Sequence, residues 1–305
     1  MQDNKLIIGS YIFLIAVSWG FSWPLIKIGL DYMGPFTFSA FRFVTGGLTL
    51  LVFLMFLYRP SLSSFNRKEW GSLIVLGFLQ TFAVFGFITY ALMFVEAGKT
   101  SIILYTMPIW SSILAPLFLK ETMTKQNAFG LLLGTAGLVF IIGNDIFLTS
   151  SIQNIIGILL VLLAAICWAS ATIYLRLKLS HANQLAVNAY QMLLGGVVFF
   201  IPALFLESDQ TIHWTKESTF AVLFTGIVAS ALCFSLWYYL LKIINTVTAT
   251  ISTMLVPVFG VIFGNLLLNE AFTFPMAIGG FCILSGIFIS QVRFPKKQNK
   301  KIISH

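Results

Sequence analysis

The feature that most restricts the fold of this chain is the wide spacing of its charged residues. Long apolar blocks run between them, and many approach the roughly 20 residues that a helix needs to cross about 30 Å of hydrocarbon. Only 9% of the 305 residues are charged and 58% are hydrophobic, whereas soluble domains carry about 25% charged residues. The chain is therefore predicted to be an integral membrane protein of α-helices, which satisfy their own backbone hydrogen bonds in lipid.

Charged and polar residues between the apolar blocks divide the chain into ten candidate spans. They cover residues 6–28, 36–57, 70–94, 100–119, 128–142, 155–175, 185–205, 220–241, 246–268 and 274–292. The predicted fold class is an all-α membrane protein with ten transmembrane helices. The fifth span is the shortest, and no connecting stretch is long enough for a separate soluble domain.

The chain also repeats itself after 149 positions. The phrase MPIWSSILAPLFLKE, from Met107 to Glu121, returns as VPVFGVIFGNLLLNE, from Val256 to Glu270. The same offset pairs Trp19 with Trp168, Lys27 with Arg176, Arg42 with Gln191, Gly77 with Gly226, Tyr90 with Tyr239, Gly130 with Gly279 and Gly137 with Gly286. One gap-free offset across five spans indicates an internal duplication.

Each half holds five spans, and an odd number forces the two halves to enter the membrane from opposite sides. This predicts two inverted five-helix repeats related by a two-fold axis in the membrane plane, an arrangement found in many secondary transporters. We assign residues 1–149 to the first repeat, 150–292 to the second, inverted repeat, and 293–305 to a basic cytoplasmic tail.

Lysine and arginine predict the orientation. With the N-terminus inside, fourteen of them fall in cytoplasmic segments and three outside, with Arg42 set aside as intramembrane. The inner group is Lys5, Arg59, Arg67, Lys68, Lys120, Lys125, Arg176, Lys178, Lys242, Arg293, Lys296, Lys297, Lys300 and Lys301, and the outer group is Lys27, Lys99 and Lys216. This positive-inside bias predicts that both termini are cytoplasmic. It also accounts for the net charge of +8 without a nucleic-acid partner.

Pro108 and Pro257 are equivalent prolines inside the fourth and ninth spans. A proline removes one helical hydrogen bond and displaces the carbonyl four residues earlier, here at Leu104 and Thr253. In hydrocarbon, such freed groups persist where they line a cavity or meet protein partners. One interpretation is a pair of broken helices on either side of a central site. The other is a packing kink satisfied by neighbouring helices.

Arg42 lies about two turns inside the second span, where ionisable residues are rare and usually face a cavity or a partner. It could bind the carboxylate or phosphate of a solute. It could equally snorkel outward or pair with Asp31 or Glu96, and the sequence leaves both interpretations open. Its counterpart Gln191 is uncharged, so recognition of charge is expected to be one-sided.

Aromatic residues are candidates to line a solute path. Trp19 and Trp23 lie on one face of the first span, and Trp168 repeats Trp19 in the second half. Further candidates are Tyr90, Tyr105, Trp237 and Tyr239. Aromatic residues in membrane helices often belong to the core or the interface instead, and this alternative stays open for each of them.

Glu121 and Glu270 end equivalent spans, and we expect them to hold the turns into the fifth and tenth spans; a proton site is the alternative. No acidic residue falls in the middle of a span, so a buried proton relay has no obvious carrier. The sequence shows no metal-ligand spacing and no nucleophile–base pair. We therefore expect no cofactor, no metal and no enzymatic activity.

Glycines give the fifth and tenth spans small faces for close helix contact. They are Gly130, Gly134 and Gly137 in the fifth span, and Gly279, Gly280 and Gly286 in the tenth. The sequence does not decide whether these faces meet each other or a second copy of the chain.

Five stretches are typical of one transporter family. They read WGFSWPLIKIGL, AFRFVTGGL and MPIWSSILAPLFLKETMT in the first half, and CWASATIYLRL and LVPVFGVIFGNLLLNEAFT in the second. Together they resemble the EamA-type, ten-span transporters of the drug/metabolite transporter (DMT) superfamily. The resemblance covers nearly the whole chain and is specific for the family, but much less so for the substrate.

The resemblance implies a carrier in the bacterial inner membrane, commonly an exporter of amino acids, other metabolites or xenobiotics. It further implies a central cavity formed mainly by spans one, three, four, six, eight and nine. With Arg42 included, the candidate substrate-binding residues are Trp19, Trp23, Arg42, Tyr90, Tyr105, Pro108, Trp168, Tyr239 and Pro257.

We therefore expect a secondary transporter that exports small organic solutes, amino-acid-like or drug-like, by alternating access. Its expected partners are the solute and the lipid bilayer, with a homodimer left open and no nucleic acid. The alternatives are a non-transporting accessory or signalling subunit and a carrier working in the uptake direction. A central cavity would favour the carrier, whereas side chains filling that space would favour the accessory subunit.

Overall fold

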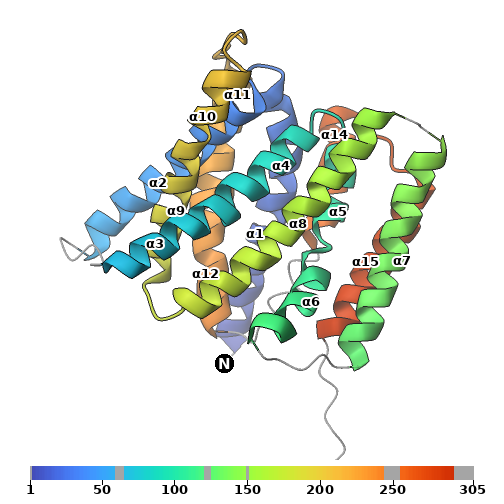
Figure 1. Cartoon of the computed structure of the whole chain (residues 1–305), viewed down its shortest axis with the longest axis horizontal. Coiled ribbons are helices and arrows are strands. Elements are labelled where there is room, and N and C mark those ends of the chain that lie inside the picture. Colours follow the sequence, from blue (N-terminus) through green and yellow to red (C-terminus); the bar gives the residue numbers. More distant parts are fainter. Residues whose placement is uncertain (1, 59–64, 120–124, 149–150, 244–254, 292–305) are drawn as a thin grey trace, which may run out of the picture.

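The computed structural model describes residues 2–58, 65–119, 125–148, 151–243 and 255–291. These residues form a bundle of helices and contain no β-strand (Figure 1). The all-helical class predicted from the sequence is confirmed for these residues. The basic tail 293–305 lies outside the described residues.

Each of the ten expected spans contains at least one helix, although residues 246–254 of the ninth lie outside the described part of the chain. In the first half the helices are α1 (Gln2–Leu30), α2 (Pro35–Tyr58), α3 (Arg67–Leu76) continued by η1 (Gly77–Ala83) and α4 (Val84–Ala91), α5 (Ala97–Leu104) with α6 (Met107–Leu119), and α7 (Lys125–Leu148). In the second half they are α8 (Ile152–Lys178), α9 (Gln184–Val198) with α10 (Phe200–Leu206), α11 (Lys216–Leu223) continued by η2 (Phe224–Leu232) and α12 (Cys233–Ile243), α14 (Leu255–Leu268), and α15 (Phe274–Gln291).

Among the described residues, six of these helices are long and apolar enough to cross a membrane. They correspond to spans one, two, three, six, seven and eight. Span four is split into α5 and α6, and the apolar helices of spans nine and ten are shorter within the described residues. The chain is thus a multi-pass helical membrane protein, and the count of ten spans stays a prediction.

The fifth span is longer than expected. We predicted residues 128–142, but α7 runs from Lys125 to Leu148. The polar pair Asn144 and Asp145 suggested a loop, yet these residues cost a helix only a few tenths of a kcal/mol each relative to alanine, up to about 0.7. Neither proline nor glycine follows them to stop the helix.

The fourth span is broken two residues before the position of its proline. α5 ends at Leu104, and Tyr105 and Thr106 form a turn before α6. The backbone N–H and the hydroxyl of Thr106 both donate to the carbonyl of Ile103, at 3.1 and 2.8 Å. Trp110 Nε1 donates in turn to Thr106 Oγ1 at 3.1 Å. Protein groups therefore satisfy the break, as the hydrocarbon requires.

Pro108 lies in a first helical turn and not in a helix interior as expected, since it is the second residue of α6. A proline is well tolerated there because the first N–H groups of a helix have no intrahelical acceptor. Pro257 lies in α14, but residues 244–254 before this helix are outside the described part of the chain, so the kink expected there stays a prediction. Thr253, whose carbonyl we expected Pro257 to free, lies outside the described residues.

Two stretches of π-helix interrupt the third and eighth spans, at η1 and η2. Gly77 begins η1, and its counterpart Gly226 lies in η2, so the wider helical turn recurs at equivalent positions. In η2 the hydroxyl of Ser230 donates to the carbonyl of Thr225 at 2.8 Å, five residues back. Such π-turns are uncommon and often lie at functional sites.

Glycines of each half pack closely against backbone of the other half. A Cβ on Gly46 would lie 2.7 Å from the Gly226 carbonyl, and one on Gly195 would lie 2.4 Å from the Gly77 carbonyl. The second contact is the first with each residue replaced by its partner at the 149-residue offset. These glycines let α2 approach η2 and let α9 approach η1 at backbone distance.

The glycine faces of the fifth and tenth spans meet within one chain. α7 and α15 lie side by side at the edge of the bundle (Figure 1). A Cβ on Gly137 would lie 2.6 Å from the Gly279 carbonyl, and one on Gly286 would lie 2.5 Å from the Gly130 carbonyl. The small faces of these two spans therefore meet each other within one chain.

Candidate functional site

Four aromatic rings from α1, α4, α8 and α12 pack in series. Ring centroids are 5.3 Å apart for Trp19 and Phe234, 5.8 Å for Phe234 and Trp168, and 6.1 Å for Trp168 and Phe85. We call these four residues the aromatic quartet. The 149-residue offset converts the Trp19–Phe234 contact into the Trp168–Phe85 contact, so the quartet joins equivalent helices of both halves.

The π-helix η2 helps to position one end of the quartet. Trp19 Nε1 donates to the carbonyl of Ala229 at 2.8 Å. In an α-helix this carbonyl would accept from the N–H of Cys233, but that N–H donates to Ser230 and Val228 instead. The Ala229 carbonyl thus lacks the donor that it would have in an α-helix, and it accepts from the indole of Trp19.

The quartet and its surroundings are packed, with Trp19 and Trp168 only partly buried. Ring separations of 5 to 6 Å are those of aromatic groups in contact. Side chains that fill this space are the outcome that we expected of an accessory subunit, so the support for a carrier has to come from other observations.

Arg42 lies directly against the quartet, over the ring of Phe85. Its guanidinium carbon is 4.7 Å from the centroid of Phe85 and 4.8 Å from that of Phe43. Its Nε donates to Ser230 Oγ in η2 at 3.2 Å, while Nη1 is buried without a hydrogen-bond partner. The residue is 3% exposed, so it does not snorkel.

The described residues place no carboxylate in an ion pair with Arg42, and neither Asp31 nor Glu96 contacts it as we had considered. Cation–π contacts and one hydroxyl compensate the buried charge only in part, because an unpaired cation in hydrocarbon costs several kcal/mol. The guanidinium therefore keeps one unused donor, Nη1.

Gln191 makes the equivalent contact in the second half, without the charge. Thr81, the counterpart of Ser230, donates its hydroxyl to Gln191 Oε1 at 2.6 Å, and Gln191 Nε2 donates to Asn188 Oδ1 at 3.0 Å. Gln191 is 1% exposed. The two halves thus keep the same side-chain contact across α2–η2 and α9–η1, but one has a cation and the other a neutral amide.

Of the other predicted residues, Trp237 lies next to the quartet, with its ring centroid 6.2 Å from that of Trp19, whereas the rest make their main contacts elsewhere. Trp23 and Tyr105 are both 6% exposed and belong to the packed core. Tyr90 stacks on Phe36 at 6.0 Å, and Tyr239 meets Tyr11 edge-on at 6.1 Å. Pro257 is buried in α14, and the side chain of Pro108 lies outside the described part of the chain.

Glu270 has a structural role, but a different one from that expected. It accepts hydrogen bonds from the N–H groups of Ala97 at 2.6 Å and Gly98 at 2.9 Å, and it pairs with Lys27 at 3.3 Å. The carboxylate thus caps the N-terminus of α5, where the helix dipole favours negative charge, in addition to closing the turn before α15 through its backbone. Its counterpart Glu121 lies outside the described residues.

Glu207 acts in the same way on α2 and was missed from the sequence. Its carboxylate accepts from the N–H groups of Phe36 at 2.7 Å and Thr37 at 2.9 Å, and from the Thr37 hydroxyl at 2.6 Å. Phe85, Phe234 and Ser230 were missed as well. The offset pairs Phe85 with Phe234 and could have indicated them, whereas contacts between spans distant in sequence carry no local signal.

Comparison with known proteins identifies a family. The model of the EamA-like transporter family matches residues 6–143 and again residues 155–291. The uncharacterized transporter YoaV of Bacillus subtilis is 30% identical over 96% of this chain and 99% of its own length. A probable amino-acid metabolite efflux pump of Escherichia coli is 27% identical over 92% of this chain and 94% of its own length.

A solved structure shares the fold. A crystal structure with 18% sequence identity superposes with a TM-score of 0.65, covering 95% of this chain and 98% of the other. The arrangement of helices described above is therefore one that has been observed experimentally.

Proposed function

The chain belongs to the EamA-like transporter family of the DMT superfamily, and from that premise we propose that it exports small organic metabolites by alternating access. The observation that carries this proposal is the double match of the family model, whose two segments start 149 residues apart. The same offset relates the halves of the aromatic quartet.

We infer that residues 1–149 and 150–292 are inverted repeats related by a two-fold axis. The exchanged contacts support this, because a two-fold relation requires that if one residue touches a second, their counterparts touch in turn. The glycine contacts, the Arg42–Ser230 and Gln191–Thr81 bonds and the quartet all follow this rule. Alternating access would then exchange the conformations of the two repeats.

We place the solute site at the quartet and Arg42. Trp19 and Trp168 would offer apolar faces, and Arg42 would attract a negative group from one side. An amino-acid-like solute has both an apolar part and a carboxylate, and it is also the kind of solute named for the Escherichia coli relative. The remaining candidates, including Trp23, Tyr90 and Tyr105, would act on the site indirectly.

We further propose a bacterial inner-membrane location with both termini in the cytoplasm. The support is the bias of fourteen lysine and arginine residues against three and the bacterial relatives. Outward transport is favoured by the efflux-pump relative. A homodimer stays open, although the glycine faces of α7 and α15 are already used within one chain.

The test is a flux assay in proteoliposomes. Purified protein is incorporated, vesicles are loaded with labelled mixtures of amino acids and related metabolites, and efflux is compared with protein-free vesicles. Gradients imposed in each direction separate export from uptake. Trp168→Ala should lower flux of the transported solute, whereas Phe205→Ala, at a position 79% exposed on α10, should not. A folded protein that moves no solute, or an unaffected Trp168→Ala variant, would contradict the proposal.

A further inference from the structure

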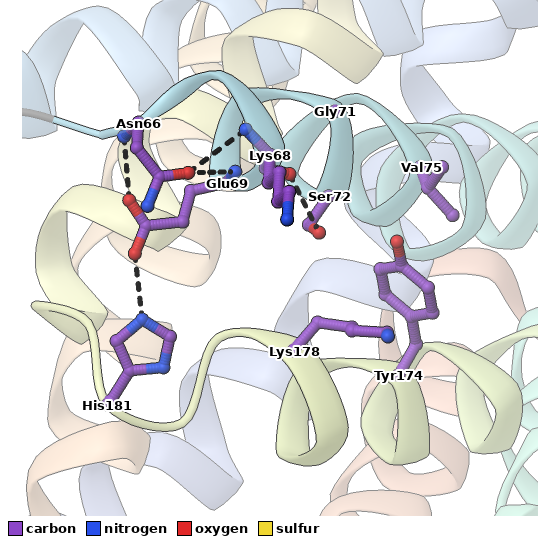
Figure 2. Close-up of a pocket in the computed structure, with 9 residues that line it drawn as sticks. All are labelled: Asn66, Lys68, Glu69, Gly71, Ser72, Val75, Tyr174, Lys178 and His181. Carbon is purple, nitrogen blue, oxygen red and sulfur yellow. Dashed lines mark hydrogen bonds and ion pairs between the residues drawn. The ribbon is translucent and has the colours of Figure 1, made fainter.

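An open pocket of about 640 Å³ separates the start of α3 from the end of α8 (Figure 2). Most of its lining side chains are polar or charged, and Val75 is aliphatic. The lining residues are Asn66, Lys68, Glu69, Gly71, Ser72, Val75, Tyr174, Lys178 and His181. Nothing in the proposed transport mechanism uses this pocket.

One rim of the pocket is held in place by hydrogen bonds. Asn66 Oδ1 accepts from the N–H groups of Lys68 and Glu69, both at 3.0 Å, and Glu69 Oε2 accepts from the Asn66 N–H at 2.7 Å. This capping box fixes the first turn of α3. The other oxygen of Glu69 lies 2.7 Å from His181 Nε2, which joins the rim to the end of α8.

The remaining charges of the lining are positive. Glu69 is its single carboxylate and already binds Asn66 and His181. Within the described residues, neither Lys68 nor Lys178 has an acidic partner. Figure 2 shows the Lys68 ammonium and the Tyr174 hydroxyl pointing into the space between the two helices from opposite sides, with the Lys178 ammonium beside the Tyr174 ring. Two cations and a hydroxyl that line one pocket are suited to a phosphate group.

The flank of the pocket is suited to lipid. Ile74, Val75 and Phe78, on α3 and η1, are 57%, 40% and 51% exposed. Trp70, one turn above them, is 38% exposed, and tryptophan is enriched at the level of lipid headgroups. An acyl chain could therefore lie on this apolar flank while its headgroup enters the pocket.

We propose that this pocket binds the phosphate of an anionic phospholipid, with Lys68 and Lys178 on either side of it. Basic pockets between transmembrane helices on the cytoplasmic side are suited to such headgroups, and both lysines fall in the predicted cytoplasmic segments. The equivalent positions at the 149-residue offset cannot bind a phosphate in the same way. The 149-residue offset puts Glu217 in place of Lys68, Gly29 in place of Lys178 and Leu25 in place of Tyr174. The site is therefore confined to one leaflet.

The experiment measures thermal unfolding of the detergent-purified full chain with three added probes. These are short-chain phosphatidylglycerol, short-chain phosphatidylcholine and inorganic phosphate. Phosphatidylglycerol should raise the midpoint in a saturable way, and the other two should not at equal concentration. Lys68→Gln/Lys178→Gln should weaken this binding roughly 30-fold, since each lysine near an anionic headgroup contributes about 1 kcal/mol.

The control is Arg67→Gln/Lys125→Gln, which removes two exposed charges from the same predicted side without touching the pocket lining. It should respond to phosphatidylglycerol as the unmodified chain does. Equal weakening in both double variants would mean that only overall charge matters, and an unchanged response in Lys68→Gln/Lys178→Gln would exclude the pocket. An equal shift of the unfolding midpoint with inorganic phosphate would mean that the pocket binds a soluble anion and not a lipid headgroup. A readout of unfolding keeps this test independent of whether the chain transports any particular solute.

Discussion

Replacing Arg42 by glutamine tests the proposed recognition of a negative group. The substitution makes the first half resemble the second, where Gln191 already bonds to Thr81. It removes one hydrogen bond from a charged donor, worth about 1.5–3 kcal/mol, and two cation–π contacts of up to about 2 kcal/mol each. It also removes a buried cation with an unpaired Nη1, whose burial costs several kcal/mol.

Because these contributions oppose each other, the free energy of unfolding should change little. Transport should change much more. A carboxylate bound to Nη1 gains a charge-assisted hydrogen bond of about 1.5–3 kcal/mol, so its loss should lower the transport efficiency roughly 10- to 100-fold. Arg42→Lys should retain part of the activity, since it keeps the charge but loses the planar fork.

The assay compares efflux of a carboxylated solute with that of its neutral amide in the same proteoliposomes, at matched protein levels. Arg42→Gln should slow the carboxylated solute selectively. Gln191→Ala is the matched control: it breaks the equivalent contact with Thr81, and it should affect both solutes alike. The reasoning fails if Arg42→Gln slows both solutes equally or prevents folding, because Arg42 would then be a structural anchor.

Three further predictions concern stability and topology. Glu270→Gln should lower the stability by about 1–2 kcal/mol, because it weakens the cap on Ala97 and Gly98 and the pairing with Lys27; thermal unfolding measures this, and exposed Glu217→Gln is the comparison. Gly137→Ala should destabilise the α7–α15 contact, since its Cβ would lie 2.6 Å from a carbonyl oxygen. Gly71→Ala, whose Cβ meets nothing within 4 Å, should be neutral or stabilising. Arg67→Cys and Lys216→Cys should react with impermeant thiol reagents from opposite sides, and labelling from one side would refute the inverted topology.

The sequence predicts the helices well because hydropathy is a local property. The expected second span, 36–57, and the expected seventh, 185–205, end within one residue of α2 and of α9 with α10. The errors fall where local signals compete. Asn144 and Asp145 suggested a loop inside α7, and Pro108 suggested a kink at a position that proves to be the start of α6.

The candidate site is harder to predict because it depends on contacts between distant spans. The offset singles out Trp19 and Trp168 but does not reveal that Phe85 and Phe234 complete the series. Arg42 is recognisable from its charge within an apolar span. Its acceptor Ser230, 188 residues away, is an ordinary hydroxyl in the sequence and becomes visible only through the packing of α2 on η2.

The two halves share their apolar contacts and differ in their charges. In the proposed inverted arrangement, inward-open and outward-open states exchange the conformations of the repeats, so shared contacts such as those of Gly46 and Gly195 contribute nearly equally to both. The energy difference between the states then rests on residues without an equivalent counterpart. One such residue is Arg42, whose counterpart at the 149-residue offset is Gln191. Another is Lys68, whose counterpart is Glu217. A ligand shifts this equilibrium only by binding one state better than the other, so a solute anion at Arg42 and a phosphate at Lys68 would each bias it.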